Sequence, residues 1–299
     1  MLDGKVAVVT GSGRGLGRAY ARALAEAGAA VVVNDVDADA AAAVVAEIEA
    51  AGGRATPVIA PVGPSATAEE LVATAVERYG RLDAMVTNAG LLRDRSVVKM
   101  SDEEFDAVIE THLRGTFTCA RAAITRFREQ GDGGRLVLVG SPAGQRASFG
   151  QTNYSAAKAG IVGMARTLAA ETNRHGITVN ALVPVALTRM VATIPALADA
   201  VAAVDRGEPV PDGLRANGVG TAEDVAPLLV YLLSDAAAGI TGQALGVGGD
   251  RISVWSHPAV AAEASRSGGW TAAAIAEEFP ALLAPHLQPY AADVPAAAR

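Results

Sequence analysis

Residues that could build a disulfide framework or a metal site are scarce in this sequence. Its 299 residues include one cysteine, Cys119, and four histidines whose positions give no metal-ligand spacing. An internal disulfide is therefore excluded, and a reducing compartment is favoured. Because Cys119 lies in an apolar helical stretch, we interpret it as a core residue rather than a reactive thiol. We expect no metal.

Long hydrophobic runs and blocks of positive charge are missing as well. No uninterrupted apolar run reaches the ~18 residues that a membrane span needs. The first ten residues lack the charged start and apolar stretch of a signal peptide. The net charge is −7, which argues against nucleic acid and anionic membranes as partners. We therefore expect a cytoplasmic protein.

Apolar side chains make up 51% of the composition, although aromatic residues contribute only 4%. Short apolar runs alternate with helical patterns, which is typical of a parallel sheet covered on both faces. The predicted fold class is α/β: a single doubly wound Rossmann domain with a parallel seven-stranded sheet and helices on both faces. The predicted strands are residues 6–10, 29–33, 55–60, 82–87, 135–139, 177–183 and 243–247.

Three helix starts are predicted from capping boxes, in which a hydroxyl and a side-chain carboxylate three residues later satisfy free backbone N–H groups. The pairs are Thr67 with Glu70, Ser101 with Glu104 and Thr221 with Asp224. The helix that begins at Ser101 is expected to run without a break to about Gly131.

The domain organisation follows from this alternation. Residues 1–250 are predicted to form the main domain. Within it, residues 187–220 are rich in Pro and Gly, as expected of a short helix and loops that act as a substrate lid. The lid contains the apolar side chains of Met190, Val191, Ile194 and Leu197. These side chains either contact an apolar ligand or pack on the protein. Residues 251–299 are predicted to be a tail that packs on the body or on a partner subunit, in part through Trp255 and Trp270.

The turn after the first predicted strand is rich in glycine. Gly11, Gly13, Gly15 and Gly17 lie between this strand and the helix that follows. Glycine there allows a tight turn and a close approach of the backbone to a pyrophosphate, which the helix N-terminus binds through free N–H groups. Because the strand and the helix stand where this mechanism needs them, the run predicts a dinucleotide site.

Asp35, which follows Gly17 by eighteen residues at the end of the second predicted strand, indicates which dinucleotide binds. A carboxylate there accepts hydrogen bonds from the adenosine ribose and repels a 2′-phosphate. We therefore predict NAD, with NADP as the alternative. Arg14 in the glycine turn favours that alternative, since a guanidinium can hold a phosphate. Asp35 alone is also a common kind of acid at a helix start.

Tyr154 and Lys158 form the pair that predicts catalysis. They stand four residues apart in a helical stretch, so they lie on one helix face. An ammonium beside a phenol favours the phenolate and lowers the pKa of the phenol. Tyr154 could then exchange a proton with an alcohol oxygen near neutral pH.

Polar residues at the ends of predicted strands belong to the same site by topology. Thr10, Asp35, Asn88 and Ser141 each stand where a strand ends. Ligands of parallel sheets bind beyond the carboxyl ends of the strands, so we expect these four residues along one edge. Taken alone, Ser141 is also an ordinary turn residue before Pro142.

Five motifs stand in an order that resembles one known family. They are Thr10-Gly11 through Gly17, Asn88-Ala89-Gly90, Ser141, Tyr154 with Lys158, and Pro184 with Thr188. Together they resemble the short-chain dehydrogenase/reductase family over residues 3 to about 250. The resemblance implies Ser141, Tyr154 and Lys158 as catalytic residues. It implies a cofactor site of Gly11, Gly13, Arg14, Gly15, Leu16, Gly17, Asp35, Val62, Asn88, Ala89, Gly90, Tyr154, Lys158, Pro184 and Thr188.

Four further stretches resemble one subgroup of that family: residues 31–35, 91–96, 112–115 and 149–154. They are similar to the (3R)-hydroxyacyl-CoA dehydrogenase domain of peroxisomal multifunctional enzyme type 2, also called 17β-hydroxysteroid dehydrogenase type 4. Three positions depart from the wider family. His112 replaces an Asn that relays protons in many relatives, and its role stays open. Pro61 replaces an Asp near the adenine, which leaves the Val62 backbone available. Val185 replaces a Gly after Pro184, which narrows the nicotinamide pocket or shifts the loop.

The function that the resemblance implies is NAD-dependent interconversion of a secondary alcohol and a ketone on an apolar substrate, such as a hydroxysteroid or a 3-hydroxyacyl-CoA. Tyr154 would exchange the proton, Lys158 would bind the nicotinamide ribose, and Ser141 would stabilise charge on the substrate oxygen. Family members are usually dimers or tetramers, so a homo-oligomer is expected. Two alternatives stay open. One is an NADPH-dependent ketoacyl reductase, against which Asp35 argues, and the other is a non-catalytic dinucleotide-binding sensor, against which the complete catalytic set argues.

Overall fold

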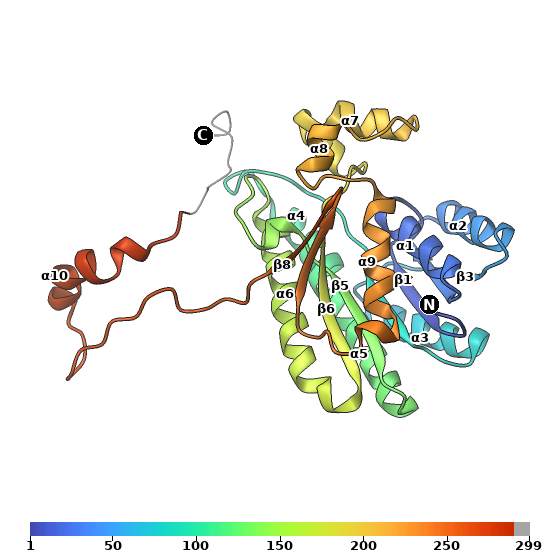
Figure 1. The fold of residues 1–299 in the computed structure, drawn as a ribbon, viewed down its shortest axis with the longest axis horizontal. Coiled ribbons are helices and arrows are strands. Elements are labelled where there is room, and N and C mark those ends of the chain that lie inside the picture. The colour runs from blue at the N-terminus through green and yellow to red at the C-terminus, as the bar shows by residue number, and fades with distance from the viewer. Residues whose placement is uncertain (290–299) are drawn as a thin grey trace. The chain divides into compact units, whose positions relative to one another are not determined.

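The computed structural model describes residues 1–289 and contains one large sheet (Figure 1). Its eight strands follow the order β3-β2-β1-β4-β5-β6-β7-β8. All neighbours pair in parallel except β7 and β8. The strands are β1 (Val6–Thr10), β2 (Ala30–Asp35), β3 (Arg54–Ile59), β4 (Ala84–Thr87), β5 (Gly134–Val139), β6 (Ile177–Pro184), β7 (Ala244–Gly248) and β8 (Arg251–Trp255). The predicted α/β class is confirmed.

Alternating side chains of the central strands supply a hydrophobic core on each face of the sheet. In β1, Ala7 and Val9 belong to one cluster, whereas Val6 and Val8 belong to the other. Strands buried on both faces are typical of parallel sheets. One face is covered by α1 (Gly15–Glu26), α2 (Ala38–Ala50) and α9 (Ala222–Leu233), and the other by α3 (Ser65–Tyr79), α5 (Gly115–Gln130) and α6 (Thr152–Thr172). Cys119 is buried in the second cluster, as predicted.

Two of the three predicted capping boxes are confirmed. The boxes at Ser101 and Thr221 start α4 (Asp102–Val108) and α9. The prediction at Thr67 is wrong, because α3 already begins at Ser65. Thr67 therefore lies inside the first turn, where its side chain is buried and faces the core.

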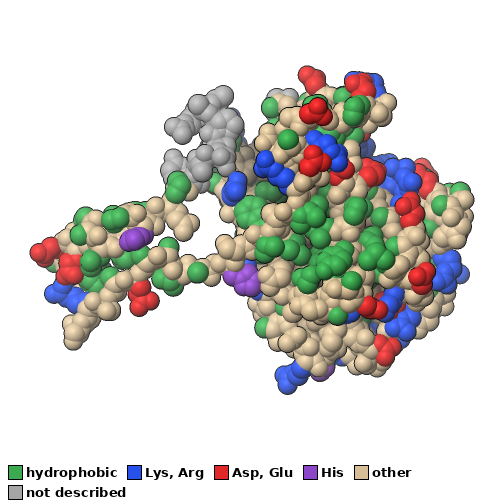
Figure 2. All heavy atoms as spheres, viewed as in Figure 1, with side chains coloured by type: hydrophobic (Ala, Val, Ile, Leu, Met, Phe, Trp, Pro, Cys, Tyr) green, Lys and Arg blue, Asp and Glu red, His purple; other side chains and the backbone are tan. Residues whose placement is uncertain are grey.

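An eighth strand extends the sheet beyond the seven that the sequence predicts. β8 runs antiparallel to β7 after a two-residue loop that begins with Gly249, whose φ of +50° favours glycine. The sequence predicts a tail from residue 251 onward, because residues 251–255 show no buried apolar run. Ile252 and Val254 are 70% and 67% exposed, as expected of an edge strand with an uncovered face. Figure 2 shows hydrophobic side chains gathered over β8 and α9.

Residues 187–220 contain two α-helices, α7 (Pro195–Asp205) and α8 (Asp212–Ala216), where the sequence predicts one short helix. A small hydrophobic cluster of Leu187, Val201 and Val210 lies among them. Val191 and Leu197 pack against this cluster. For these two side chains, packing on the protein is therefore the better interpretation than contact with a ligand.

The chain divides into two compact units at Trp255, the last residue of β8. All three hydrophobic clusters belong to the first unit. In the second unit, α10 (Ala272–Leu282) is capped by Thr271, and Ala274 is the one buried residue among residues 256–289. The Arg266 guanidinium lies over the Trp270 ring. Among the described residues, each helix is too short or too polar to cross a bilayer.

Candidate active site

Hydrogen bonds between the ends of β1 and β4 build the floor of the site. The Asn88 side-chain amide donates to the carbonyl oxygens of Thr10 and Gly11, both at 3.0 Å. The backbone N–H groups of Asn88 and Ala89 donate to the Thr10 hydroxyl, also at 3.0 Å. The turn after β4 is thereby fixed to the glycine turn after β1, at the edge where ligands of parallel sheets bind.

The glycine turn after β1 has the shape that a pyrophosphate needs. Gly11 and Gly15 have φ values of +61° and +53°, and a Cβ at Gly17 would lie 2.1 Å from the carbonyl oxygen of Gly11. The N-cap residue of α1, Arg14, makes no side-chain capping bond in the described chain, so the first N–H groups of this helix can bind an anion. Leu16 packs against the first core cluster and anchors the helix start. These residues fit the phosphates of a dinucleotide.

Asp35 closes β2 against the same turn. One carboxylate oxygen accepts the Gly13 N–H at 2.9 Å, and the other accepts the Asp37 N–H at 3.1 Å. A Cβ at Gly13 would lie 2.8 Å from this carboxylate, so only glycine allows the contact. An ionised carboxylate has about four acceptor positions. Two therefore remain for ribose hydroxyls.

Next to Asp35, a residue that sequence reasoning missed joins β2 to the end of β3. Asn34 is buried, and its amide donates to the carbonyl oxygens of Val58 and Ala60 at 3.1 and 2.9 Å. Val62 packs against the second core cluster, and a Cβ at Gly115 would lie 2.9 Å from its methyl group. The sequence signals for Asn34 are its place beside the strand-ending acid and its membership of the stretch 31–35, and neither gives it a structural role.

The structure brings the three predicted catalytic side chains together. The Lys158 Nζ lies 5.5 Å from the centroid of the Tyr154 ring and donates to the Val139 carbonyl at 2.6 Å. Ser141 follows β5, and its hydroxyl accepts the N–H of Ala143 at 3.2 Å. A hydrogen bond also links Ser141 to Tyr154. β5 thus presents the serine to the helix face that carries the tyrosine and the lysine.

Burial shifts the pKa values of the Tyr–Lys pair in opposite directions. Lys158 is 3% exposed, and desolvation lowers its pKa to about 7. Burial raises the pKa of Tyr154, although the hydrogen bond with Ser141 opposes this rise. The sequence predicts a lowered pKa for Tyr154, and that direction is not found. The reason is that burial of the phenol is the largest cause of its shift, and burial of Lys158 separately disfavours the charged ammonium that would stabilise the phenolate.

His112 borders the tyrosine from a π-helical turn, η1 (Ile109–Arg114), which interrupts the long helix predicted from Ser101. Its ring stands edge-on to Tyr154, with the centroids 5.1 Å apart. Nε2 lies 3.0 Å from the Leu91 nitrogen and 2.8 Å from the Leu91 oxygen. Nδ1 is buried without a partner in the described chain. Burial lowers the pKa of His112 to about 3, so the ring is neutral at neutral pH.

Asn153 is a second residue that sequence reasoning missed. Its fully buried amide donates to the carbonyl oxygens of Arg93 and Glu104 at 3.1 and 3.2 Å. Its side-chain oxygen accepts the N–H of Tyr154 at 2.7 Å. The start of α6 is thereby tied to α4 and to the loop after β4. The sequence signal is only a polar residue before Tyr154, which many helix starts share.

Pro184 and Thr188 reach the site from the end of β6. Pro184 closes this strand beside β7, and a Cβ at Gly15 would lie 3.9 Å from the Thr188 methyl group. Thr188 therefore stands next to the glycine turn. The Cβ of Val185 would lie 3.0 Å from a Cβ at Gly248, so Val185 lies against the end of β7.

Known proteins share this arrangement of motifs and strands. Residues 5–196 match the family model described as short chain dehydrogenase. The chain belongs to this family. Short-chain dehydrogenases are oxidoreductases that bind a nicotinamide dinucleotide and act on CH–OH groups, and this chain is therefore an enzyme of that class.

Relatives extend the likeness over most of the chain. It is 40% identical to the short-chain reductase protein NovJ of Streptomyces niveus over 251 residues, which are 82% of this chain and 93% of NovJ. It is 46% identical to peroxisomal multifunctional enzyme type 2 of Mus musculus over 151 residues, which are 50% of this chain and 20% of that enzyme. A solved short chain dehydrogenase from Mycobacterium avium is 39% identical with a TM-score of 0.83, and the match covers 97% of this chain and 98% of that one. The predicted resemblance to the multifunctional enzyme is confirmed over half the chain.

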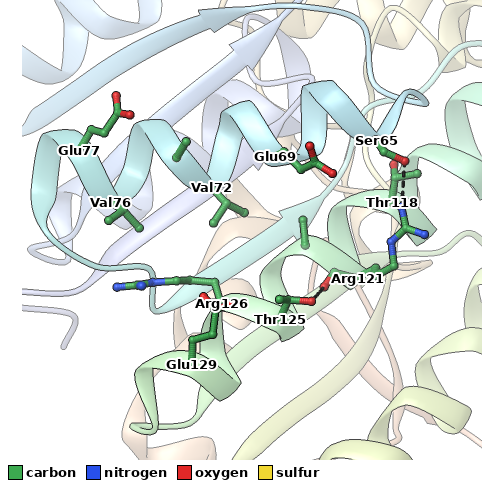
Figure 3. A pocket seen from close by; sticks show the side chains of 12 residues that line it. Ser65, Glu69, Val72, Val76, Glu77, Thr118, Arg121, Thr125, Arg126 and Glu129 are labelled. Carbon is green, nitrogen blue, oxygen red and sulfur yellow. Dashed lines mark hydrogen bonds between the residues drawn. The ribbon is translucent and has the colours of Figure 1, made fainter.

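A groove of about 450 Å³ lies between α3 and α5 (Figure 3). Val72 and Val76 line it from α3, and Arg121 and Arg126 line it from α5. The Arg121 guanidinium donates to the Ser65 hydroxyl at its rim, at 2.8 Å. The residues that line this groove are all different from the predicted site residues, so the groove is separate from the dehydrogenase site.

Proposed function

We propose that this short-chain dehydrogenase interconverts a secondary alcohol and a ketone on an apolar substrate, with NAD as its dinucleotide. One observation carries the proposal. Ser141, Tyr154 and Lys158 meet at the end of β5, on the edge of the sheet where β1 also ends. Such a group can bind a substrate oxygen and exchange its proton, which is the chemistry that alcohol oxidation and ketone reduction share.

Each of the three residues has a separate task in this reaction. The dinucleotide, when bound, accepts or supplies the hydride. Tyr154 takes the hydroxyl proton during oxidation and returns it during reduction. Ser141 donates a hydrogen bond to the substrate oxygen. Lys158, held by the Val139 carbonyl, binds the nicotinamide ribose and, when protonated, favours the phenolate of Tyr154.

The charges near the glycine turn support NAD as the dinucleotide. Asp35 ends β2 with a carboxylate that would repel a 2′-phosphate. Arg14, the cation that favours NADP, lies 2.6 Å from an Asp37 oxygen. Both observations disfavour a ligand with an extra phosphate at this position.

Substrates with a keto or hydroxyl group on an acyl chain or a steroid are the classes that we propose. The half-chain likeness to peroxisomal multifunctional enzyme type 2 supports them. In the lid, the Ile194 side chain is 47% exposed and can contact an apolar ligand. The second candidate is an NADPH-dependent ketoacyl reductase. A 35% identity to the 3-oxoacyl-[acyl-carrier-protein] reductase FabG of Thermotoga maritima, over 83% of this chain and 98% of FabG, favours it.

The assembly and location of the protein also remain proposals. We propose a homodimer or homotetramer, as the family resemblance implies, and a cytoplasmic location, as the sequence pattern suggests. Residues 256–289 expose several large apolar side chains of α10, including Ile275 and Leu282. We propose that the C-terminal unit buries them against the body or against a partner subunit.

Turnover with each dinucleotide tests the proposed function. We would measure kcat/KM with NADH and NADPH on 3-oxoacyl-CoA esters and ketosteroids, and expect NADH to be preferred. Tyr154→Phe should abolish turnover, because the proton donor is lost. Ser141→Ala should lower kcat by about 10²–10³-fold, the usual effect of removing one such donor.

Tyr79→Phe is the control for the tyrosine variant. The Tyr79 hydroxyl bonds only to Thr56 in the described chain, at 2.8 Å and outside the predicted site, so its loss should leave kcat unchanged. Unchanged turnover in Tyr154→Phe would show that the assigned mechanism is wrong. A clear preference for NADPH on ketoacyl substrates would select the second candidate.

A further inference from the structure

A salt bridge joins the glycine turn to the turn after β2. The Arg14 guanidinium lies 2.6 Å from one oxygen of Asp37, while the other oxygen accepts the backbone N–H of Ala40 at 3.0 Å. Asp37 thus caps α2 and holds Arg14 at the same time. The hydrogen bonds from Ala40 and Arg14 keep the pKa of the Asp37 carboxyl below its ordinary value, so this group is ionised at neutral pH.

The salt bridge stands beside the carboxylate that we assign to the ribose. Asp35 accepts the N–H of Gly13, which precedes Arg14, and the N–H of Asp37. Three charged side chains therefore meet in two adjoining turns. A phosphate on the 2′-oxygen would face two carboxylates and a guanidinium that is already paired.

We propose that Asp37 is a specificity residue that withholds Arg14 from the 2′-phosphate of NADP and places a second negative charge beside Asp35. The inference rests on the proposed binding of NAD at this turn. A free guanidinium binds phosphate through two parallel hydrogen bonds, so an unpaired Arg14 would favour NADP. Paired with Asp37, the arginine contributes little of that attraction, and the carboxylate repels the phosphate.

Stability alone does not account for a carboxylate at this position. The Arg14 and Asp37 side chains are 50% and 35% exposed, and exposed ion pairs stabilise a fold only weakly. Capping does not require a carboxylate either, because serine caps helices as well as aspartate does. Compared with a serine at this position, the Asp37 carboxylate adds a negative charge and the salt bridge with Arg14.

Asp37→Ser separates the two roles, because it keeps the cap and removes the salt bridge. Isothermal titration calorimetry on the full chain gives the dissociation constants of NAD⁺ and NADP⁺ without any substrate. We expect the affinity for NADP⁺ to rise roughly five- to tenfold, while the affinity for NAD⁺ changes less than about twofold. The rise should shrink at high ionic strength, because it depends on exposed charges.

Asp39→Ser is the matched control. Asp39 is exposed in the first turn of the same helix, so this variant loses the same charge without releasing Arg14. Only Asp37→Ser should change the ratio of the two affinities by the full amount, and adding Arg14→Ala should remove the larger part of the gain for NADP⁺, leaving only the part due to the lost carboxylate charge. Equal effects of the two serine variants, or a gain that Arg14→Ala leaves undiminished, would overturn the inference.

The same titrations keep this inference apart from the proposed cofactor. The wild-type affinities alone decide between NAD and NADP, so tighter binding of NADP⁺ by the wild type would overturn the proposed function. The comparison of Asp37→Ser with Asp39→Ser decides the role of Asp37, whichever dinucleotide the wild type prefers.

Discussion

At the scale of a single residue, the protonation of the buried Lys158 side chain makes the stability of the fold depend on pH. Burial lowers its pKa to about 7, whereas a lysine in an unfolded chain titrates near ~10.4. Below about pH 7 the side chain is charged in both states, and folding bears the full desolvation cost. Between these two pKa values the unfolded state binds more protons, so stability rises with pH. We expect the advantage of Lys158→Met over wild type to be greatest at and below about pH 7 and to shrink as the pH rises above it.

Urea unfolding between about pH 6.5 and 9.5, without added dinucleotide, measures this difference. One group changes the free energy of unfolding by at most about 1.4 kcal/mol per pH unit. Any constant cost of leaving the Val139 carbonyl without its donor shifts the curve but not its slope. Lys99→Met, at an exposed lysine, is the control. A difference between Lys158→Met and wild type that stays the same at every pH would contradict the lowered pKa.

Sequence reasoning reached the residues whose type and spacing carry chemistry, but not their surroundings. Tyr154 and Lys158 could be paired because four residues make one helical turn. The raised pKa of Tyr154 depends on burial by segments that are distant in the sequence. Asn153 was missed for the same reason, since its partner Arg93 lies 60 positions away and no spacing rule connects them.

At the scale of elements, the start of α6 is held by a buried amide. The Gln151 side chain makes no capping bond in the described chain, whereas Asn153 binds the carbonyl oxygens of Arg93 and Glu104. Asn153→Ala would remove this donor from both carbonyl oxygens and leave the partly buried contact unsatisfied. We expect the free energy of unfolding to fall by about 1–3 kcal/mol. We also expect kcat to fall, because the backbone N–H of Tyr154 loses its partner.

Urea unfolding and steady-state kinetics of Asn153→Ala test this role of the amide. Thr152→Ala is the matched control, because Thr152 is the preceding residue of the same helix and is exposed. The control should leave both stability and kcat nearly unchanged. Equal losses in the two variants would show that helix propensity, and not the buried amide, holds the start of α6.

The elements that the sequence predicts are those with a clear local pattern. β1 and β2 were found because they are buried on both faces and read as apolar runs. β8 was missed because its side chains are mostly exposed and its pairing comes from the neighbouring strand β7. The π-helical turn η1 was missed because a single extra residue per turn leaves no mark on an amphipathic pattern.

At the scale of the whole molecule, the order of the strands explains where the site lies. The sheet runs outward from β1 in both directions, through β2 and β3 on one side and β4 to β7 on the other. The strand order therefore reverses between β1 and β4, which is where ligands of doubly wound sheets bind. Thr10 and Asn88 bond to each other at this point. The sequence predicts a shared edge, but the order of the strands follows only from pairing between distant segments.

The exposed apolar side chains of the whole molecule argue for association. Ile252 and Val254 are exposed on β8, and Ile275 and Phe279 are 46% and 36% exposed on α10. Each of the two units thus exposes large apolar side chains of its own, and exposed apolar surface is usually covered by a partner. We therefore expect light scattering coupled to size-exclusion chromatography to give the mass of a dimer or tetramer. A monomer at micromolar concentration would contradict this expectation.

Deletion of residues 256–299 then tests what the C-terminal unit contributes. All three core clusters lie within Met1–Trp255, so the truncated chain should still unfold in one cooperative transition in urea. Its oligomer should dissociate at a lower dilution factor than that of the full chain, because the apolar side chains of α10 are gone. A truncated chain that no longer unfolds cooperatively would show that the body needs the second unit to fold. An unchanged mass and dissociation constant would instead exclude the second unit from the subunit interface.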